Sequence, residues 1–397
     1  MEKLIKDFEI PNKKIETWKF TDLKKIFEKN NFKPFIKPSE NANKSILINP
    51  NISKNIFFNS KINFVIFENG CLKKINVKSN HLEIKSSKNS LKEKIFSKKN
   101  FSRKDSLFEI NSAFLNEDLI IRVKKNKKLN EPISIFYYNC EEEKYLINNR
   151  INIILEENAE AEINEIFFSN NKSSYWNNVH KYVHLKKNSK LDHYKIQLES
   201  NNALHSSSTN IDCDNSSIYN SFIFSVGSAM SRIEVTSSIN STDINLNVKG
   251  IYLAKDNQHQ DITTLMQHRY PGSKSNQHIK GILKNESSGV FQGKVIVSQD
   301  AQKTDAFQFN QNLLLSKNTK VNAKPELEIY ADDVKCSHGA TTGELDEEKL
   351  FYLRTRGLNK EEATKILIEG FINELFEDIK NKELKKKLLF TSKKIIY

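Results

Sequence analysis

The polar residues best spaced for chemistry lie between residues 331 and 340, where the sequence reads ADDVKCSHGA. Cys336 and His338 are separated by one residue, so on a β-strand both side chains point to the same face. A thiolate and an imidazole together suit zinc, copper and iron–sulfur species. Two ligands are too few for a closed site. The sequence therefore predicts a metal site that is open or completed by a second chain.

Two other interpretations of this segment stay open on residue type alone. Composition favours a core cysteine beside a surface histidine. Alternatively, Cys336 is a nucleophile and His338 its base, with Asp332 or Asp333 orienting the imidazole. This second interpretation is weaker, because residues on one strand face do not readily supply the orienting group.

Other patterns carry less chemistry. His259, His268 and His278 recur at spacings that do not match a helical or short-loop metal site, so we expect structural roles for them. The sequence contains no GxxxxGK[ST], GxSxG or GxGxxG motif. These patterns predict no ATP site in this chain and no stand-alone enzyme.

Composition narrows the class of protein. Among 397 residues, 62 Lys and Arg outnumber 49 Asp and Glu, for a net charge of +13, but only seven of the basic residues are Arg. Arg binds phosphates and base edges with a planar, bidentate group that Lys lacks. The low Arg content therefore disfavours specific nucleic-acid binding. No apolar run approaches a membrane helix, and the N-terminus does not resemble a signal peptide. We expect a cytoplasmic protein.

The arrangement of the four cysteines also favours a cytoplasmic protein. Cys71, Cys140, Cys213 and Cys336 lie far apart and form no CxxC pair. A disulfide framework is typical of small, cysteine-dense secreted domains. The cysteine pattern therefore predicts a reducing environment.

Hydrophobic patterning divides the chain into three regions. Residues 1–116 are mixed, and their start is predicted to be helical, with Thr21 or Asp22 as a cap and the apolar set Ile15, Trp18, Leu23 and Ile26. Residues 117–343 show many short alternating strands, such as 151–155 and 222–226, separated by Asn and small polar residues. This pattern suits a sandwich, a large barrel or a parallel β-helix without choosing among them. The segment KGI at 249–251 recurs at 280–282, which hints at a coil-like repeat.

Residues 344–397 read as helices. Asp346 is placed to cap a helix that ends at Gly357. Asn359 and Glu362 then resemble a capping box. The following helix is expected to present one apolar stripe, to the β core or to another protein: Ala363, Ile366, Leu367, Phe371, Leu375 and Ile379.

A long ordered set of motifs resembles the SufB/SufD family of iron–sulfur cluster assembly scaffolds. The motifs are VFQGK at 290–294, QKTDA at 302–306, NLLLS at 312–316 and the run KPELEIYADDVKCSHGAT at 324–341. His268, Pro271, Ser273, Lys280 and Gly281 resemble a further family block. Residues 16–23, ETWKFTDL, resemble the start typical of SufD members, whereas residues 40–106 match poorly.

The resemblance implies a mainly β fold. It has a right-handed parallel β-helix core at 117–343, an N-terminal α/β region at 1–116 and a C-terminal helical domain at 344–397. SufD is favoured over SufB because the chain is short for SufB and lacks the extra cysteine motif of many SufB proteins.

The resemblance also implies a role for particular residues. His338 and Cys336 become candidate ligands of iron or of a transient iron–sulfur cluster, shared with a SufB partner at a heterodimer interface. The C-terminal helical part matches the region that docks the ATPase SufC, and ATP hydrolysis then belongs to SufC. Its candidate docking residues here are Leu350, Phe351, Leu353, Arg356 and Gly357.

Three alternatives accompany this interpretation. Within the family, the chain could be a SufB-like scaffold acting as a homodimer. From other classes, a β-helix carbohydrate-active enzyme and a basic nucleic-acid-binding module are the distant alternatives. The missing signal peptide and the low Arg content disfavour these two.

Overall fold

The computed structural model of the chain describes residues 5–35, 48–86, 106–140 and 143–396. Its helices are η1 (Ile5–Asp7), η2 (Glu16–Trp18), α1 (Leu23–Asn30), α2 (Pro50–Ser53), α3 (Ser106–Ala113), α4 (Glu347–Thr355), α5 (Lys360–Phe376) and α6 (Lys382–Ile396). The first ten strands are β1 (Lys33–Pro34), β2 (Asn63–Glu68), β3 (Cys71–Asn76), β4 (Leu82–Ser86), β5 (Glu117–Val123), β6 (Ile133–Asn139), β7 (Tyr145–Leu155), β8 (Glu160–Ser169), β9 (Tyr175–Leu185) and β10 (Lys190–Glu199). The others are β11 (Leu204–Cys213), β12 (Ile218–Gly227), β13 (Met230–Ile239), β14 (Asn245–Ala254), β15 (His259–His268), β16 (Lys274–Leu283), β17 (Ser288–Val297), β18 (Asp305–Leu314), β19 (Lys320–Ile329) and β20 (Lys335–Glu344).

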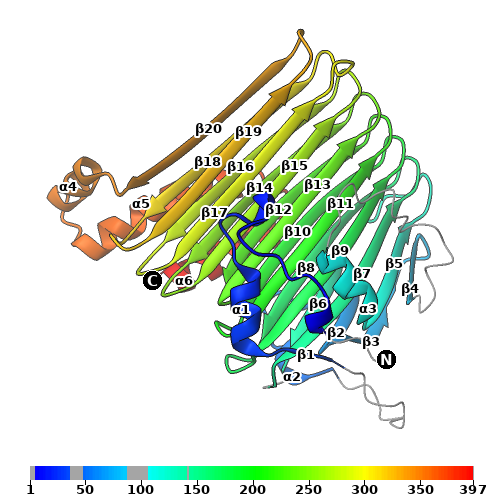
Figure 1. Cartoon of the computed structure of the whole chain (residues 1–397), viewed down its shortest axis with the longest axis horizontal. Helices are drawn as coiled ribbons and strands as arrows, with labels where there is room; N and C mark the ends of the chain where they lie inside the picture. The colour runs from blue at the N-terminus through cyan, green and yellow to red at the C-terminus, as the bar shows by residue number, and fades with distance from the viewer. Residues whose placement is uncertain (1–4, 36–47, 87–105, 141–142, 397) are drawn as a thin grey trace.

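The strands form two ten-stranded sheets that face each other. Odd-numbered strands from β5 to β19 make up most of one, here called sheet A, and even-numbered strands from β6 to β20 most of the other, sheet B. Successive strands alternate between the sheets and pair in parallel with the strand one coil earlier, so the chain winds as a coil (Figure 1). The predicted parallel β-helix core is therefore confirmed.

The alternating apolar residues seen in the sequence form strands, but they face two different ways. Ile151, Ile153 and Leu155 of β7 point into the coil. Phe222 and Phe224 of β12 point outward and pack beneath the C-terminal helices. Alternation alone identifies a strand and leaves open which face is covered.

Asparagines at the corners explain the polar spacers between strands. Asn126, Asn158 and Asn188 all have positive φ, near 58°, a conformation that Asn tolerates better than most residues. Their side chains also bond from coil to coil: Asn188 Nδ2 donates to Asn158 Oδ1 at 3.0 Å, and Asn158 Nδ2 to Asn126 Oδ1 at 2.6 Å. Each corner is thereby tied to the next.

The sheets extend upstream of residue 117. β2 pairs in parallel with β6, while β3 and β4 pair antiparallel with β2 and β5. The apolar N-terminal set does not form one helix: Trp18 ends η2, and α1 begins after Asp22, whose side chain accepts from the Lys25 N–H at 3.1 Å. Ile15 and Trp18 precede α1 and pack, with α1 and α3, on the outer face of sheet A.

The C-terminal helices begin where the sequence predicts. Asp346 Oδ1 accepts from the Lys349 N–H at 3.0 Å, and Asn359 and Glu362 form the capping box. Helices α5 and α6 cover the outer face of sheet B. The predicted stripe is wrong at Ile366, which is 46% exposed, whereas Ile368 and Ile372 are buried. Three adjacent apolar residues at 366–368 allow more than one stripe, and the packing against sheet B selects the face.

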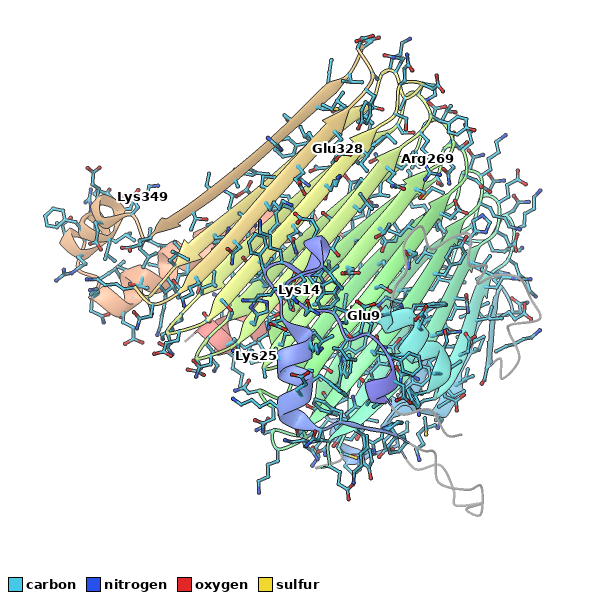
Figure 2. The ribbon with its side chains drawn as sticks, in the orientation of Figure 1. Glu9, Lys14, Lys25, Arg269, Glu328 and Lys349 are labelled. Carbon is cyan, nitrogen blue, oxygen red and sulfur yellow. The ribbon has the colours of Figure 1, made fainter. Side chains whose placement is uncertain are left out.

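Helix α4 follows β20 and projects from the last coil, away from the N-terminal segment that crosses sheet A (Figure 1). Figure 2 shows Lys349 of α4 far from Glu9, Lys14 and Lys25 of that segment. Among the described residues no helix is long and apolar enough to span a membrane.

Charged side chains also lie inside the coil, which the sequence did not predict. The carboxylate of Glu165 is 3.0 Å from the Lys181 ammonium and 3.1 Å from His193 Nε2. Burial by itself raises the pKa of Glu165, but Lys181 and His193 outweigh that effect and hold it well below its usual range. For Lys195, burial disfavours the charged ammonium and lowers its pKa. This ammonium donates to Ser207 Oγ at 2.5 Å.

We expect the protein to lose stability as the pH falls from 7 to 5. Burial lowers the pKa of His268 and His205 to about 4 and that of His180 to about 3. The unfolded chain takes up these protons near pH 6.5, so between that pH and about 4 it binds more protons than the fold does. Each histidine should then cost about 2 kcal/mol of unfolding free energy at pH 5.

Urea denaturation at pH 7 and pH 5 measures this loss. The variant His268→Gln should reduce the difference between the two pH values by about 2 kcal/mol. An undiminished difference in this variant would show that His268 is not the titrating group.

Candidate functional site

Cys336 and His338 lie on the last coil of the β-helix. Their strand, β20, pairs with β18 at one edge of sheet B, and no described strand pairs with its other edge. In this pairing Cys336 stands beside Ala306 and His338 beside Gln308, both of which are buried. Neighbouring residues in a parallel pair share a face. Cys336 and His338 therefore both face the inside of the coil, at its open end.

The open end gives the two side chains different surroundings. Cys336 is partly buried against the apolar core between the sheets, whereas His338 is exposed. The edge of sheet A at this end, β19, is also only partly buried along most of its length. A second chain could reach His338 without displacing any described element.

The structure argues against Cys336 as a nucleophile. Partial burial, with a smaller contribution from Asp305, raises the pKa of the Cys336 thiol above its ordinary value. A catalytic cysteine needs the opposite shift. Asp332 and Asp333 lie exposed in the turn before β20, and within the described residues neither carboxylate hydrogen-bonds His338. No orienting group completes a triad in this part of the chain.

The described residues include no group of three or more His, Cys, Asp and Glu side chains arranged to hold a metal ion. The three histidines noted in the sequence lie apart. Their rings contact Ser288, Ser275 and Gln311 at 2.7, 2.8 and 3.0 Å, from His259, His268 and His278 respectively. These are structural hydrogen bonds, as expected. Any metal bound by Cys336 and His338 would need ligands beyond those that the described residues bring together.

Comparison with known proteins identifies the family of the chain. The family model described as "SUF system FeS cluster assembly, SufBD core domain" matches residues 137–371, more than half of the chain. The chain belongs to the SufB/SufD family. The matched region runs from β6 into α5 and includes Cys336 and His338.

Two of three similar proteins carry SufD or SufBD names. The Escherichia coli "Iron-sulfur cluster assembly protein SufD" is 32% identical over 272 residues, 68% of this chain and 64% of that protein. A SufBD family protein of Synechocystis is 30% identical over 279 residues, and the chloroplastic protein ABCI7 of Arabidopsis thaliana 33% over 294. These matches cover 68% and 72% of this chain and 62% of each relative. The chain thus spans slightly less than two thirds of the length of these relatives.

The SufD-like N-terminal motif, outside the matched region, is held by a buried ion pair. Arg232 donates to Asp261 Oδ2 at 2.5 Å and to the Thr17 carbonyl at 2.7 Å, and its guanidinium lies 4.0 Å from the centre of the Trp18 ring. Thr21 Oγ1 donates to the same Asp261 carboxylate. Burial disfavours the charged guanidinium, but Asp261 outweighs it and raises the pKa of Arg232.

Sequence reasoning missed this ion pair. The pair and the two residues that it holds, Trp18 and Thr21, are here called the N-terminal latch (Trp18, Thr21, Arg232 and Asp261). The two signals available were the scarcity of Arg in a Lys-rich chain and the proximity of Asp261 to His259. Neither indicates a contact with residues 17–21. The latch gives the family-like motif a structural role, which is to dock the N-terminal segment on sheet A.

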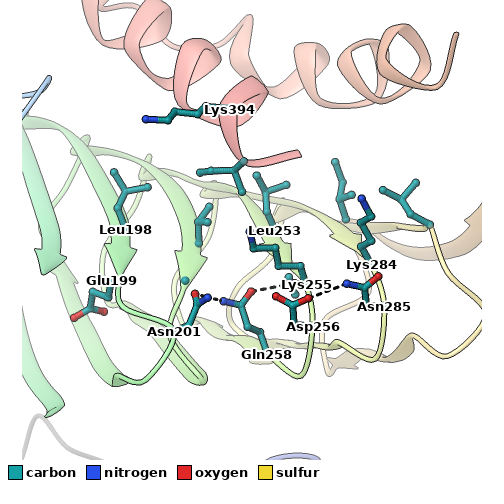
Figure 3. Close-up of a pocket in the computed structure, with 16 residues that line it drawn as sticks. Leu198, Glu199, Asn201, Leu253, Lys255, Asp256, Gln258, Lys284, Asn285 and Lys394 are labelled. Carbon is teal, nitrogen blue, oxygen red and sulfur yellow. Dashed lines mark hydrogen bonds between the residues drawn. The ribbon is translucent and has the colours of Figure 1, made fainter. Parts of the chain in front are cut away.

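A separate cavity of about 560 Å³ lies outside the coil, between α6 and the corners of sheet B. Figure 3 shows Leu198 and Leu253 on its floor, Lys394 of α6 above, and Lys255 and Lys284 around its edge. Neither Cys336 nor His338 lines this cavity.

Proposed function

We propose that this chain is a SufD-like subunit of a cytoplasmic SufBCD complex that assembles iron–sulfur clusters and transfers them to other proteins. The cluster is cargo, held between the last coil of this chain and a SufB-like partner. The observation that carries the proposal is the location of Cys336 and His338. Both lie on β20, two positions apart, and face the inside of the coil at its open end.

The chemistry of the donors supports a shared site. Cysteine and histidine both ligate iron in iron–sulfur proteins, and histidine in place of cysteine changes the reduction potential. His338 is exposed and Cys336 partly exposed, so a partner can supply the missing ligands. A site divided between two chains can also open when one chain moves, which suits a scaffold that must release its product.

The open edges of β19 and β20 support a partner at the same place. Edge strands present free N–H and C=O groups that readily pair with another strand. A SufB-like β-helix docking there would extend both sheets and cover His338. We therefore place the SufB-like partner at this end of the coil.

Helix α4 and its surroundings are the proposed docking site for a SufC-like ATPase, which would supply ATP hydrolysis. Leu350 is buried and anchors α4, while Leu353 is partly buried. Phe351 and Tyr352 are 67% and 56% exposed. Arg356 stacks near Tyr352, and Gly357 ends the helix with φ of 93°. Large exposed aromatics of this kind are frequent hot spots in interfaces.

Phe351→Ala is expected to weaken binding of the SufC-like ATPase by about 2 kcal/mol, roughly 30-fold, because the ring leaves water only in the complex. Isothermal titration of the purified proteins measures the affinity. Phe390→Ala on α6 is the matched control, since Phe390 is 61% exposed on a different helix. Equal affinities for both variants would place the ATPase elsewhere.

Anaerobic co-expression with the SufB-like and SufC-like proteins of the same organism tests the whole proposal. Size-exclusion chromatography with mass determination should give an assembly of one copy of this chain, one SufB-like chain and two SufC-like chains. If the chain elutes with itself, the SufB-like homodimeric scaffold replaces this proposal. If it elutes alone, both scaffold proposals fail.

A further inference from the structure

A column of polar side chains lies directly beneath His338 inside the coil. Gln277 of β16, Gln308 of β18 and His338 of β20 occupy the same register position in three successive coils. Gln277 and Gln308 are fully buried. Their amides form the polar floor of the open end, and His338 is its uppermost member.

The hydrogen bonds within the column show how the side-chain amide of Gln308 is oriented. Thr264 Oγ1 donates to Gln277 Oε1, and Gln308 Nε2 donates to the same oxygen at 3.4 Å. The amide nitrogen of Gln308 therefore faces the preceding coil. Its Oε1, on the other side of the amide carbon, has no hydrogen-bond partner among the described residues. A buried carbonyl without a partner costs free energy.

Gly293 makes room for this amide. Gln308 reaches across the coil towards β17, where a Cβ atom on Gly293 would overlap Gln308 Nε2. Any larger residue at position 293 would displace the amide. Gly293, part of the VFQGK motif, thus holds the Gln308 side chain in its place beneath His338.

His338 is the neighbour of Gln308 on the adjoining strand. Neighbouring strands in a sheet are about 4.8 Å apart, so a side chain on β20 can meet the one beside it on β18. A histidine that ligates a metal through one ring nitrogen usually donates the other N–H to an oxygen, which fixes its tautomer and orientation. Gln308 Oε1 is such an oxygen.

We propose that Gln308 is a positioning residue for His338. Its Oε1 accepts the N–H of one imidazole nitrogen and leaves the lone pair of the other nitrogen directed to the mouth of the coil, where iron would bind. This inference rests on the proposed function for its purpose, but both side chains belong to this chain, so the hydrogen bond between them can be tested without a partner.

The tautomer of His338 tests the contact directly. The full chain, deuterated and labelled with ¹⁵N-histidine, is examined by long-range ¹H–¹⁵N correlation at pH 8, where an ordinary imidazole is neutral. His338→Gln identifies the signals. One tautomer should dominate in the wild type and in Gln308→Glu, which keeps an acceptor, whereas Gln308→Met should give a mixture. The same tautomer balance in the wild type and in Gln308→Met would overturn the proposal.

Cobalt(II) binding to the complex with the SufB-like partner separates this proposal from the proposed function. Gln308→Met should weaken Co²⁺ binding by roughly 10–100-fold, with recovery in Gln308→Glu. If His338→Gln weakens binding and Gln308→Met does not, the positioning role fails while the shared site stands. If neither variant alters binding, the shared site itself fails, even where the tautomer depends on Gln308.

Discussion

Replacing His338 with alanine is expected to reduce iron–sulfur cluster formation by more than about 10-fold while the complex still assembles. Loss of a residue that merely supports a metal ligand already costs roughly 10–100-fold in affinity, so loss of a ligand should cost at least as much. The side chain is exposed in the isolated chain, so its removal leaves no cavity in the core. Anaerobic reconstitution with iron and sulfide, followed by absorption spectroscopy and iron analysis, measures the yield.

His184→Ala is the matched control for this variant. His184 lies on β9, far along the coil from β20, and its Nε2 is 3.7 Å from Asp214. This substitution should leave the cluster yield at the wild-type level. A His338→Ala chain that fails to bind the SufB-like partner would instead assign His338 a packing role at the interface.

Replacing Asp261 with alanine is expected to lower the free energy of unfolding by about 3–5 kcal/mol, because it leaves the buried Arg232 guanidinium without its main counter-charge. Thr21 loses one of its two hydrogen-bond partners at the same time and keeps His259. Trp18 lies against Arg232 and is one of two tryptophans in the chain. Its fluorescence during urea denaturation, in a Trp176→Phe background, therefore reports on the N-terminal latch.

Two further variants separate the buried charge from other effects. Glu234→Ala removes a second carboxylate that bonds Arg232, but Glu234 is partly exposed, and its loss should cost only about 1 kcal/mol. The double variant Arg232→Met with Asp261→Ala removes both buried charges and should recover much of the lost stability. If Asp261→Ala costs no more than Glu234→Ala, the latch does not depend on the buried ion pair.

The local features of this fold were accessible from the sequence. Asp346 and Asn359 cap their helices where predicted, because a cap is a hydrogen bond between residues three positions apart. The strand containing Ile151 and Ile153 was equally evident from its alternation. Where several faces were possible, as at Ile366, the sequence alone did not select the buried one, since the packed partner lies on a distant strand.

The repeated KGI segment at residues 249–251 and 280–282 also shows what the sequence alone did not determine. The two segments do lie on neighbouring strands of sheet B, β14 and β16. However, Gly250 pairs with Ile279 and Gly281 with Tyr252, so the segments are not in register. Similar residues in successive coils indicate a repeat, while corner lengths decide the register.

The sequence by itself determined the strands, the helix caps, the family and the shared face of Cys336 and His338, because each depends on residues close together in the chain or on an ordered set of motifs. Only the tertiary structure decided that these two residues lie on an open last coil, with His338 above Gln308. It also paired Thr21 with Asp261, 240 residues apart. The physical reason is that coil stacking brings together residues from different coils, and no local pattern records which coil ends uncovered.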